Sequence, residues 1–186
     1  SDLVCSGGFD PHVENGIYYS GHMKFDISSP DYCIGTPFDI TPISLENITT
    51  PVKGVVVGEV FGFTQEATRN GDKMNTVYNI TNGYASLEVH NNYLEIDEAK
   101  ELASHIKDGV SVALRGYAKH ETRKGRTDED LTFIASDVAI VSKIKRVDNA
   151  PVKRVELHLH TNMSSMDALP PSDMVVKTAK AWGHPA

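Results

Sequence analysis

Hydrophobic and polar positions alternate with the period of β-strands through most of residues 51–147. The first apolar run, Val52 to Phe63, is interrupted by three glycines, which predicts a strongly bent or bulged strand. Four more runs of the same kind predict strands at Met74 to Thr81, Tyr84 to His90, Val110 to His120 and Leu131 to Val141. The Asn-Gly pairs at 70–71 and 82–83 predict the turns that join the first three strands.

One helix is predicted between the third and fourth strands. Asp97 is a candidate N-cap and Gly109 a candidate stop, and apolar residues recur between them at helical spacing: Ala99, Leu102, Ala103 and Ile106. The polar stretch Glu121 to Asp130 is predicted to be a loop. Three strands, a helix and two strands, with a long bent first strand, favour a mainly β OB-fold, a five-stranded Greek-key barrel with one helix. Another small barrel or an α+β sandwich is the alternative.

The flanking segments differ from this barrel in pattern. Residues 1–50 lack sustained periodicity and are interpreted as an N-terminal arm and linker, with a small hairpin predicted between Gly16–Tyr19 and Met23–Ile27. In residues 148–186, Lys153 to His160 alternates as a strand, and a helix with a possible N-cap at Ser172 is predicted to run to Gly183. A strand and a helix make half of a βαβ unit, so this segment resembles part of a larger α/β domain.

Charge is distributed unevenly along the 186 residues. The net charge is −7, but residues 1–49 carry seven acidic residues and one lysine, whereas residues 50–148 carry fifteen acidic and thirteen basic residues. The acidity therefore belongs mainly to the arm and does not exclude a nucleic-acid partner for the barrel. The longest apolar runs fall far short of the ~20 residues of a membrane span. Two cysteines cannot build a disulfide framework, which favours reduced thiols and a cytoplasmic protein.

A candidate metal site follows the barrel. His158 and His160 are two residues apart, so a strand would place both imidazoles on one face, and Asp167 follows seven residues later. Two histidines and a carboxylate suit zinc, manganese or iron. The plain alternative is a pair of surface histidines on an edge strand.

The segment KRVELHLHTNMSSMDALPPSDMVVKTAKAWGH resembles the opening of the PHP (polymerase and histidinol phosphatase) domain of PolC-type DNA polymerase III alpha subunits. The stretches GEVFGF, YNITNGYASLEVH, LASHIKDGVSVALRGYAKHET and DLTFIASDVAIV resemble that family's OB domain, and DYCIGTPFDITPISLENI resembles its linker. The resemblance covers about 31–186. It divides the chain into an acidic arm and linker at 1–50, an OB-fold domain at 51–147 and a truncated N-terminal part of a PHP domain at 148–186.

The resemblance implies that the parent is a DNA-directed DNA polymerase with an associated 3'-5' exonuclease, working in replication with a sliding clamp and a clamp loader. The metal ligands of the family correspond to His158, His160 and Asp167. The other ligands, the exonuclease and the polymerase aspartates would lie beyond residue 186, so no catalytic residue is expected in this chain. We expect manganese or zinc in the parent, and weak or absent metal binding here.

For the barrel, the sequence predicts binding of single-stranded DNA through basic and aromatic side chains on the strands and their loops. The candidates are Arg69, Lys73, Phe61, Phe63, Arg115, Tyr117, Lys119, Arg123, Lys124 and Arg126. Acidic neighbours at 121 and 128–130 weaken this surface, and a solvated charged loop beside core aromatics is the alternative. Two other functions stay open: a PHP-family metallophosphoesterase with an OB domain, and a protein-interaction barrel that binds replisome partners. Walker, dinucleotide-binding and GxSxG motifs are absent from the sequence.

Overall fold

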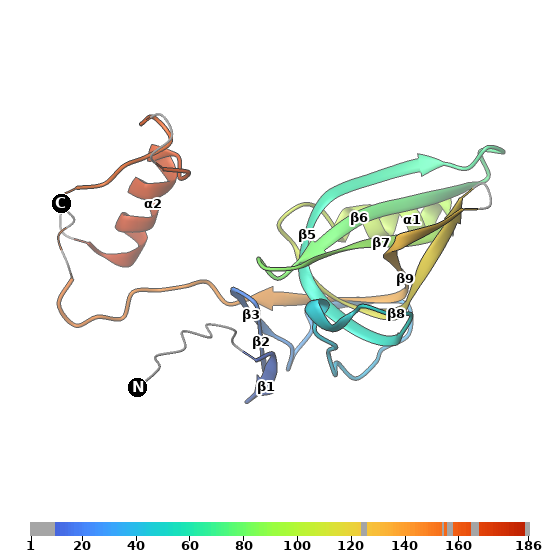
Figure 1. The fold of residues 1–186 in the computed structure, drawn as a ribbon, viewed down its shortest axis with the longest axis horizontal. Helices are drawn as coiled ribbons and strands as arrows, with labels where there is room; N and C mark the ends of the chain where they lie inside the picture. The colour runs from blue at the N-terminus through green and yellow to red at the C-terminus, as the bar shows by residue number, and fades with distance from the viewer. Residues whose placement is uncertain (1–9, 124–125, 154, 156–157, 165–167, 185–186) are drawn as a thin grey trace. The chain divides into compact units, whose positions relative to one another are not determined.

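The structure is a computed structural model that describes residues 10–123, 126–153, 155, 158–164 and 168–184, with backbone alone at 121–123 and 126–129. These residues fall into two compact units, 1–144 and 145–186. Figure 1 shows the strands of the first unit and the single α-helix of the second. Within the described residues, no helix is long and apolar enough to cross a membrane.

Five strands of the first unit close into a barrel. They are β5 (Lys53–Ala67), β6 (Lys73–Thr81), β7 (Ser86–Glu95), β8 (Ser111–Arg123) and β9 (Arg126–Lys143). β5 pairs antiparallel with both β6 and β8, β6 pairs with β7, and β8 pairs with β9. The barrel closes where β7 runs parallel to β9, with Val89 beside Phe133. This order, with α1 (Ile96–His105) between the third and fourth barrel strands, is the OB-fold that the sequence predicted.

The long first strand of the barrel bends as its glycines predicted. Its register with β6 shifts between Phe61 and Thr64, and Gly62 in this bulge has φ +66°. This left-handed backbone conformation costs little free energy for glycine and more for other residues. The bend allows β5 to join both halves of the barrel.

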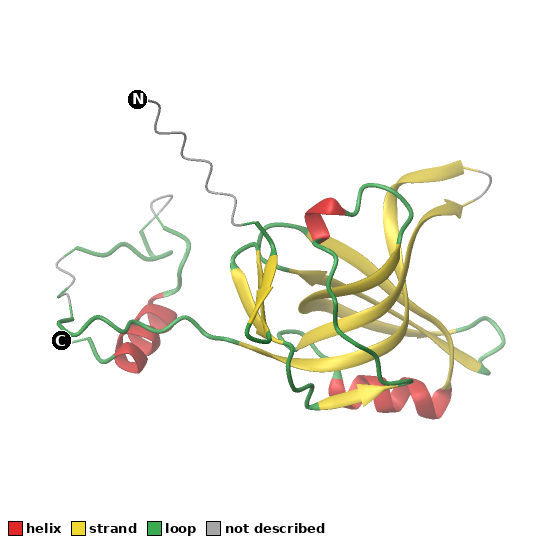
Figure 2. Ribbon diagram, turned by 90° about the horizontal axis from the view of Figure 1, so that it is seen from below, coloured by secondary structure: helices red, strands yellow, loops and turns green. Residues whose placement is uncertain are grey.

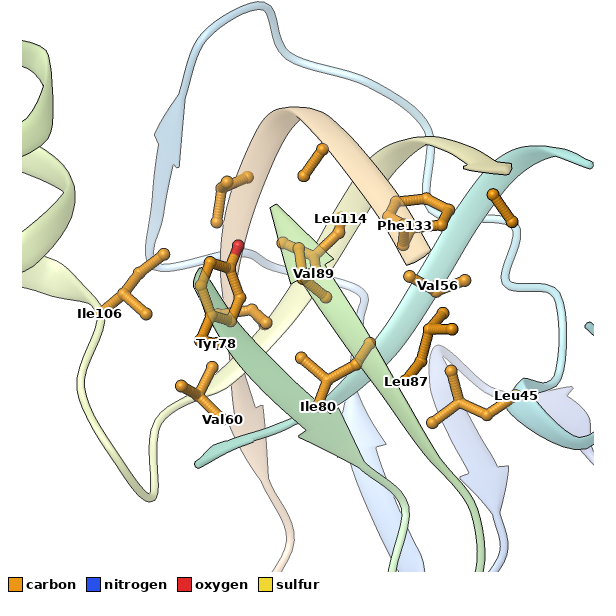
Figure 3. Packing of buried hydrophobic residues seen from close by; sticks show 14 of the residues in the cluster. Leu45, Val56, Val60, Tyr78, Ile80, Leu87, Val89, Ile106, Leu114 and Phe133 are labelled. Carbon is orange, nitrogen blue, oxygen red and sulfur yellow. The ribbon is translucent and has the colours of Figure 1, made fainter. Parts of the chain in front are cut away.

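The barrel core consists of inward-facing residues from all five strands. Figure 3 shows Tyr78, Val89, Leu114 and Phe133 pointing toward one another, with Ile106 packing from the segment after α1. The hydroxyl of the fully buried Tyr78 donates to Asn91 Oδ1 at 3.0 Å, so its polar atom is satisfied.

The strands among residues 10–34 form an outer layer on this barrel, whereas Leu45 and Ile48 further along join the barrel core. β1 (His12–Glu14), β2 (Ile17–Ser20) and β3 (Met23–Asp26) make a meander that joins β9, and β4 (Tyr32–Ile34) pairs with β9 further along. A short 3-10 helix, η1 (Leu45–Asn47), follows. Tyr18 and Phe25 pack on the outward-facing Val55 and Val57. The predicted hairpin is confirmed, but these residues are a packed layer rather than a separate arm.

This outer layer explains why three valines occur in succession at 55–57, where a strand with one solvent-exposed face would alternate apolar and polar residues. Val56 faces the barrel core, whereas Val55 and Val57 face the outer layer, so all three are buried. A strand covered on both faces carries apolar side chains at successive positions.

Several predicted boundaries were wrong. β8 and β9 continue as a paired ribbon through most of the predicted loop at 121–130, because their backbones keep pairing as far as Arg123 and Arg126. The N-cap of α1 is Glu95, which forms a capping box with Glu98, and not Asp97. The helix ends at His105, before Gly109.

The second unit contains α2 (Ser172–Trp182), which ends at Gly183 in a left-handed conformation as predicted. Its N-cap is Pro171 and not Ser172. The indole N–H of Trp182 donates to the Arg146 carbonyl at 3.0 Å. The predicted strand at 153–160 is not observed at its described positions, since strand geometry requires a hydrogen-bonded neighbour and no described segment pairs with it.

Candidate nucleic-acid interface

Two hairpins of the barrel project toward the same end of the first unit. Figures 1 and 2 show the β5–β6 hairpin and the β8–β9 ribbon at this end, because β5 curves around the barrel between its two partners. In OB-folds, the face of the second and third strands and the loops that flank it bind oligonucleotides. Here that face belongs to β6 and β7.

The β5–β6 hairpin borders a pocket of ≈ 520 Å³. Arg69 and Lys73 line it together with polar side chains and one tyrosine, the other lining residues being Thr68, Asn70, Asp72, Asn75 and Tyr93. Arg69 is exposed and makes no ion pair with any side chain that the structure describes. Lys73 Nζ lies 3.0 Å from Glu95 Oε1, and the hydrogen bond to Glu95 raises the pKa of Lys73, so the ammonium stays charged.

The two predicted aromatic residues of β5 differ in exposure. Phe61 is exposed, as a residue that stacks on a base must be. Phe63 packs partly against the barrel core, with its ring centroid 5.9 Å from that of Tyr78. The bulge at Gly62 separates them, and Phe61 is exposed whereas Phe63 is half-buried.

The three residues predicted on β8, Arg115, Tyr117 and Lys119, also differ in their availability for binding. Tyr117 and Lys119 are exposed on the outer face. Arg115 is held by Asp137 on the neighbouring strand, with Nη2 2.8 Å and Nε 2.9 Å from Asp137 Oδ2. Its guanidinium also lies 5.2 Å from the centroid of the Phe38 ring, so it joins the barrel to the outer layer.

Two of the three basic residues predicted after β8 are placed by backbone pairing. Arg123 and Arg126 lie opposite each other at the end of the β8–β9 ribbon. Their side chains are outside the described part of the structure, and Lys124 lies outside the described residues altogether. The backbone pairing therefore places Arg123 and Arg126 at the end of the projecting β8–β9 ribbon.

The sequence pattern alone did not indicate Tyr93. It is 69% exposed, lines the pocket beside Arg69 and Lys73, and has φ +59°. A tyrosine in the left-handed region is uncommon and indicates either a turn or a functional constraint. The sequence shows only an aromatic residue after two asparagines, because the bulge that turns its side chain outward depends on pairing with β6.

The predicted metal site is described in part. His158 Nε2 and His160 Nε2 face each other 2.5 Å apart, and Asp167 lies outside the described residues. At this separation the two nitrogens contact each other directly, closer than the about 3.3 Å between tetrahedral ligands of one zinc ion. Among the described residues, no group of three or more histidine, cysteine, aspartate or glutamate side chains could hold a metal.

The chain is similar in sequence to DNA polymerase III PolC-type proteins. A DNA polymerase III PolC-type from Caldanaerobacter subterraneus subsp. tengcongensis is 33% identical over 154 residues, which cover 82% of this chain. The PolC-type protein of Streptococcus sanguinis is 36% identical over 150 residues, or 80% of this chain. The aligned segment is 10% of each relative, so the chain spans about a tenth of the length of these proteins. No family model matches the chain.

Among solved structures, the mitochondrial single-stranded DNA-binding protein Rim1 from S. cerevisiae is similar over 48% of this chain and 94% of its own. The identity is 16% and the TM-score 0.37, a likeness too distant to support an argument about function. The OB-fold of this chain rests on its own strand pairing.

Proposed function

This chain is related to one segment of the PolC-type DNA polymerase III proteins, and we propose that its barrel binds single-stranded DNA as part of such a polymerase. The observation that carries the proposal is the end of the barrel where two projecting hairpins flank the outer face of β6 and β7. Basic and aromatic side chains are available there or on the strands that lead to it: the exposed Arg69, Phe61, Tyr117 and Lys119, and the half-buried Lys73. Basic residues that follow the backbone and rings that stack on bases are the two components of single-strand binding.

The charge of this surface predicts weak and salt-dependent binding. Lys73 already pairs with Glu95, and Asp72 lies on the rim of the pocket beside Arg69. Each phosphate contact releases condensed counterions, and the logarithm of the binding constant falls with the logarithm of salt concentration by ~0.7 per contact for single strands. The few uncommitted cations therefore limit the affinity, and binding should be strongly salt-dependent and measurable mainly at low salt.

A titration of a fluorescein-labelled oligothymidylate with the whole chain tests the proposal by fluorescence anisotropy. Replacing Arg123, Lys124 and Arg126 together by Gln should weaken binding roughly tenfold or more at low salt and reduce the salt slope by about 2. A matched triple variant, Lys100→Gln, Lys107→Gln and Lys177→Gln, removes the same charge from α1, the segment after it and α2. This control variant should bind DNA nearly as tightly as the unsubstituted chain of 186 residues, which is called the parent chain below.

Equal weakening by the two triple variants would show that only net charge matters and would contradict the proposed surface. No binding by the parent chain at 20 mM salt would overturn the function itself. That outcome would favour the protein-interaction barrel, in which the same face would bind a partner of the replication machinery.

We further propose that the parent protein carries out template-directed nucleotide addition with an associated 3'-5' exonuclease, and works with a sliding clamp and a clamp loader. The relatives' name supports a polymerase, and the small share of their length in this chain is consistent with catalytic residues elsewhere. A reading frame with a full set of PHP ligands but without polymerase motifs would instead favour the metallophosphoesterase.

For the metal site, we propose that His158, His160 and Asp167 contribute ligands to a manganese or zinc ion of a PHP domain. The proximity of the two imidazoles supports this, and three ligands of a larger cluster give weak binding in this chain. A bound ion would supply Lewis-acid polarisation of a phosphoryl oxygen. Calorimetry with Mn²⁺ or Zn²⁺ should show an affinity weaker than micromolar, and a sub-micromolar affinity lost on His158→Ala would contradict the expected weakness.

A further inference from the structure

The side chain of Tyr93 faces solvent because of a bulge in β7. Thr76 pairs with Asn91 and Met74 pairs with Leu94, so Asn92 and Tyr93 together oppose Asn75. Strict alternation from Leu87, Val89 and Asn91, which are buried, would turn Tyr93 inward. The extra residue instead brings Leu94 against the core and leaves Tyr93 exposed.

The backbone at Tyr93 is held in an unfavourable conformation. Its φ of +59° lies in the left-handed region, where glycine and asparagine are the common residues. The N–H of Tyr93 donates to Asn75 Oδ1 at 3.0 Å, which fixes the bulge from the neighbouring strand. Since the ring is 69% exposed, its burial offsets little of this cost. Folding alone therefore gives little reason for a tyrosine at this position, and such outliers cluster at ligand sites.

The surroundings of Tyr93 suit one nucleotide of a single strand. The pocket beside it measures ≈ 520 Å³, within the ~300–1,000 Å³ of small-molecule sites. Arg69 supplies an exposed cation on the hairpin side, and Lys73 supplies a second one that also pairs with Glu95. Asn70 and Asn75 supply amide groups that donate and accept hydrogen bonds. Asp72 is the one acidic side chain in the lining, and it accepts a hydrogen bond from Thr68 Oγ1 at 2.9 Å.

We propose that Tyr93 stacks on one base of the bound DNA strand while Arg69 and Lys73 bind the phosphate next to that base. This subsite rests on the proposed single-strand binding and gives it a location. The hydroxyl of Tyr93 is not needed for stacking, so the aromatic ring is the functional group.

Two substitutions at Tyr93 separate stacking from stability. Tyr93→Gly removes the ring and relieves the left-handed backbone, so this variant should unfold at a temperature no lower than the parent chain. It should nevertheless bind an oligothymidylate at least about fivefold more weakly, the low end of what one stacked base contributes. Tyr93→Phe should bind within about twofold of the parent. Tyr84→Ala is the matched control, because Tyr84 is 75% exposed but lies outside the pocket, and it should leave binding unchanged.

Photo-cross-linking identifies directly which residue contacts the base. An oligonucleotide with one 5-iododeoxyuridine, irradiated with the whole chain, should yield a cross-linked peptide that mass spectrometry maps to Tyr93, and Arg69→Gln should reduce its yield. Unchanged affinity of Tyr93→Gly, or cross-links only elsewhere, would overturn the subsite while leaving single-strand binding in place. Absence of binding by the parent chain would overturn both.

Discussion

Arg115 and Asp137 face each other across β8 and β9, and two guanidinium nitrogens of Arg115 lie 2.8 and 2.9 Å from one carboxylate oxygen of Asp137. The other oxygen, Oδ1, accepts the backbone N–H of Thr36 at 2.7 Å. This pair ties the barrel to the segment after β4. Sequence alone assigned Arg115 to the DNA-binding row, but its charge is committed within the fold.

Arg115→Gln should therefore lower stability more than DNA affinity. We expect a loss of about 1–2 kcal/mol in the free energy of unfolding, because Asp137 loses a charged hydrogen-bond partner. Lys119→Gln, on the same face but exposed, should leave stability unchanged and reduce the salt slope of binding by ~0.7. Urea denaturation and anisotropy titrations of both variants measure this difference. If Arg115→Gln lowered DNA affinity and left stability unchanged, Arg115 would belong to the binding surface after all.

Asp137 should make stability depend on acid. Burial, the largest influence, acts to raise the pKa of Asp137, but hydrogen bonds from Thr36, Ser136 and Arg115 outweigh it and hold the pKa below its usual value. The stabilisation is therefore present above the unfolded-state pKa of ~3.9, and is lost as pH falls through the lower folded-state value.

Asp137→Asn should cost about 2 kcal/mol at pH 7, and the difference from the parent chain should shrink below about pH 4. Urea denaturation at pH 7, 5 and 3.5 measures it. Asp173→Asn, on the exposed surface of α2, is the control and should leave the unfolding of the barrel unchanged at each pH. An equal difference at all three pH values would show that the carboxylate charge does not contribute.

Two glycines should respond very differently to alanine. A Cβ on Gly116 would lie 2.0 Å from the backbone oxygen of Ile134, at the point where the register of β8 and β9 shifts. Gly116→Ala should cost more than about 4 kcal/mol, since backbone atoms of the paired strand would have to move. Gly71 in the β5–β6 turn has φ +73° and open space around it, so Gly71→Ala should cost about 1–2 kcal/mol. Thermal unfolding compares them, and equal shifts would contradict the close approach.

The outer layer should unfold together with the barrel. Phe25 is fully buried against outward-facing residues of β5, β8 and β9. Phe25→Ala should cost about 3–5 kcal/mol in a single cooperative transition, whereas Val13→Ala on exposed β1 should stay within about 0.5 kcal/mol. A separate early transition of residues 10–50 by hydrogen exchange, with the barrel unaffected, would show that the layer is an independent arm.

The predicted hairpins at Asn70-Gly71 and Asn82-Gly83 follow from local chemistry, and both glycines have positive φ. The length of the β8–β9 ribbon could not be predicted in the same way. Polar residues at 121–130 carry no burial pattern, and only pairing with the opposite strand orders their backbone. The sequence found most of the exposed residues of the candidate interface but included Phe63 and Arg115, because strand period gives a face and not the partner across it.

Amino-acid order alone determined the number of barrel strands, the helix between the third and fourth, and the bending of the first strand, since turn chemistry and periodicity act over a few residues. Tertiary structure decided which faces those strands cover and which charges remain available. The outer layer buried Val55 and Val57, Asp137 engaged Arg115, and the bulge opposite Asn75 turned Tyr93 outward. Each of these contacts joins residues on different strands, so the chain acquires them only when the strands pair and pack.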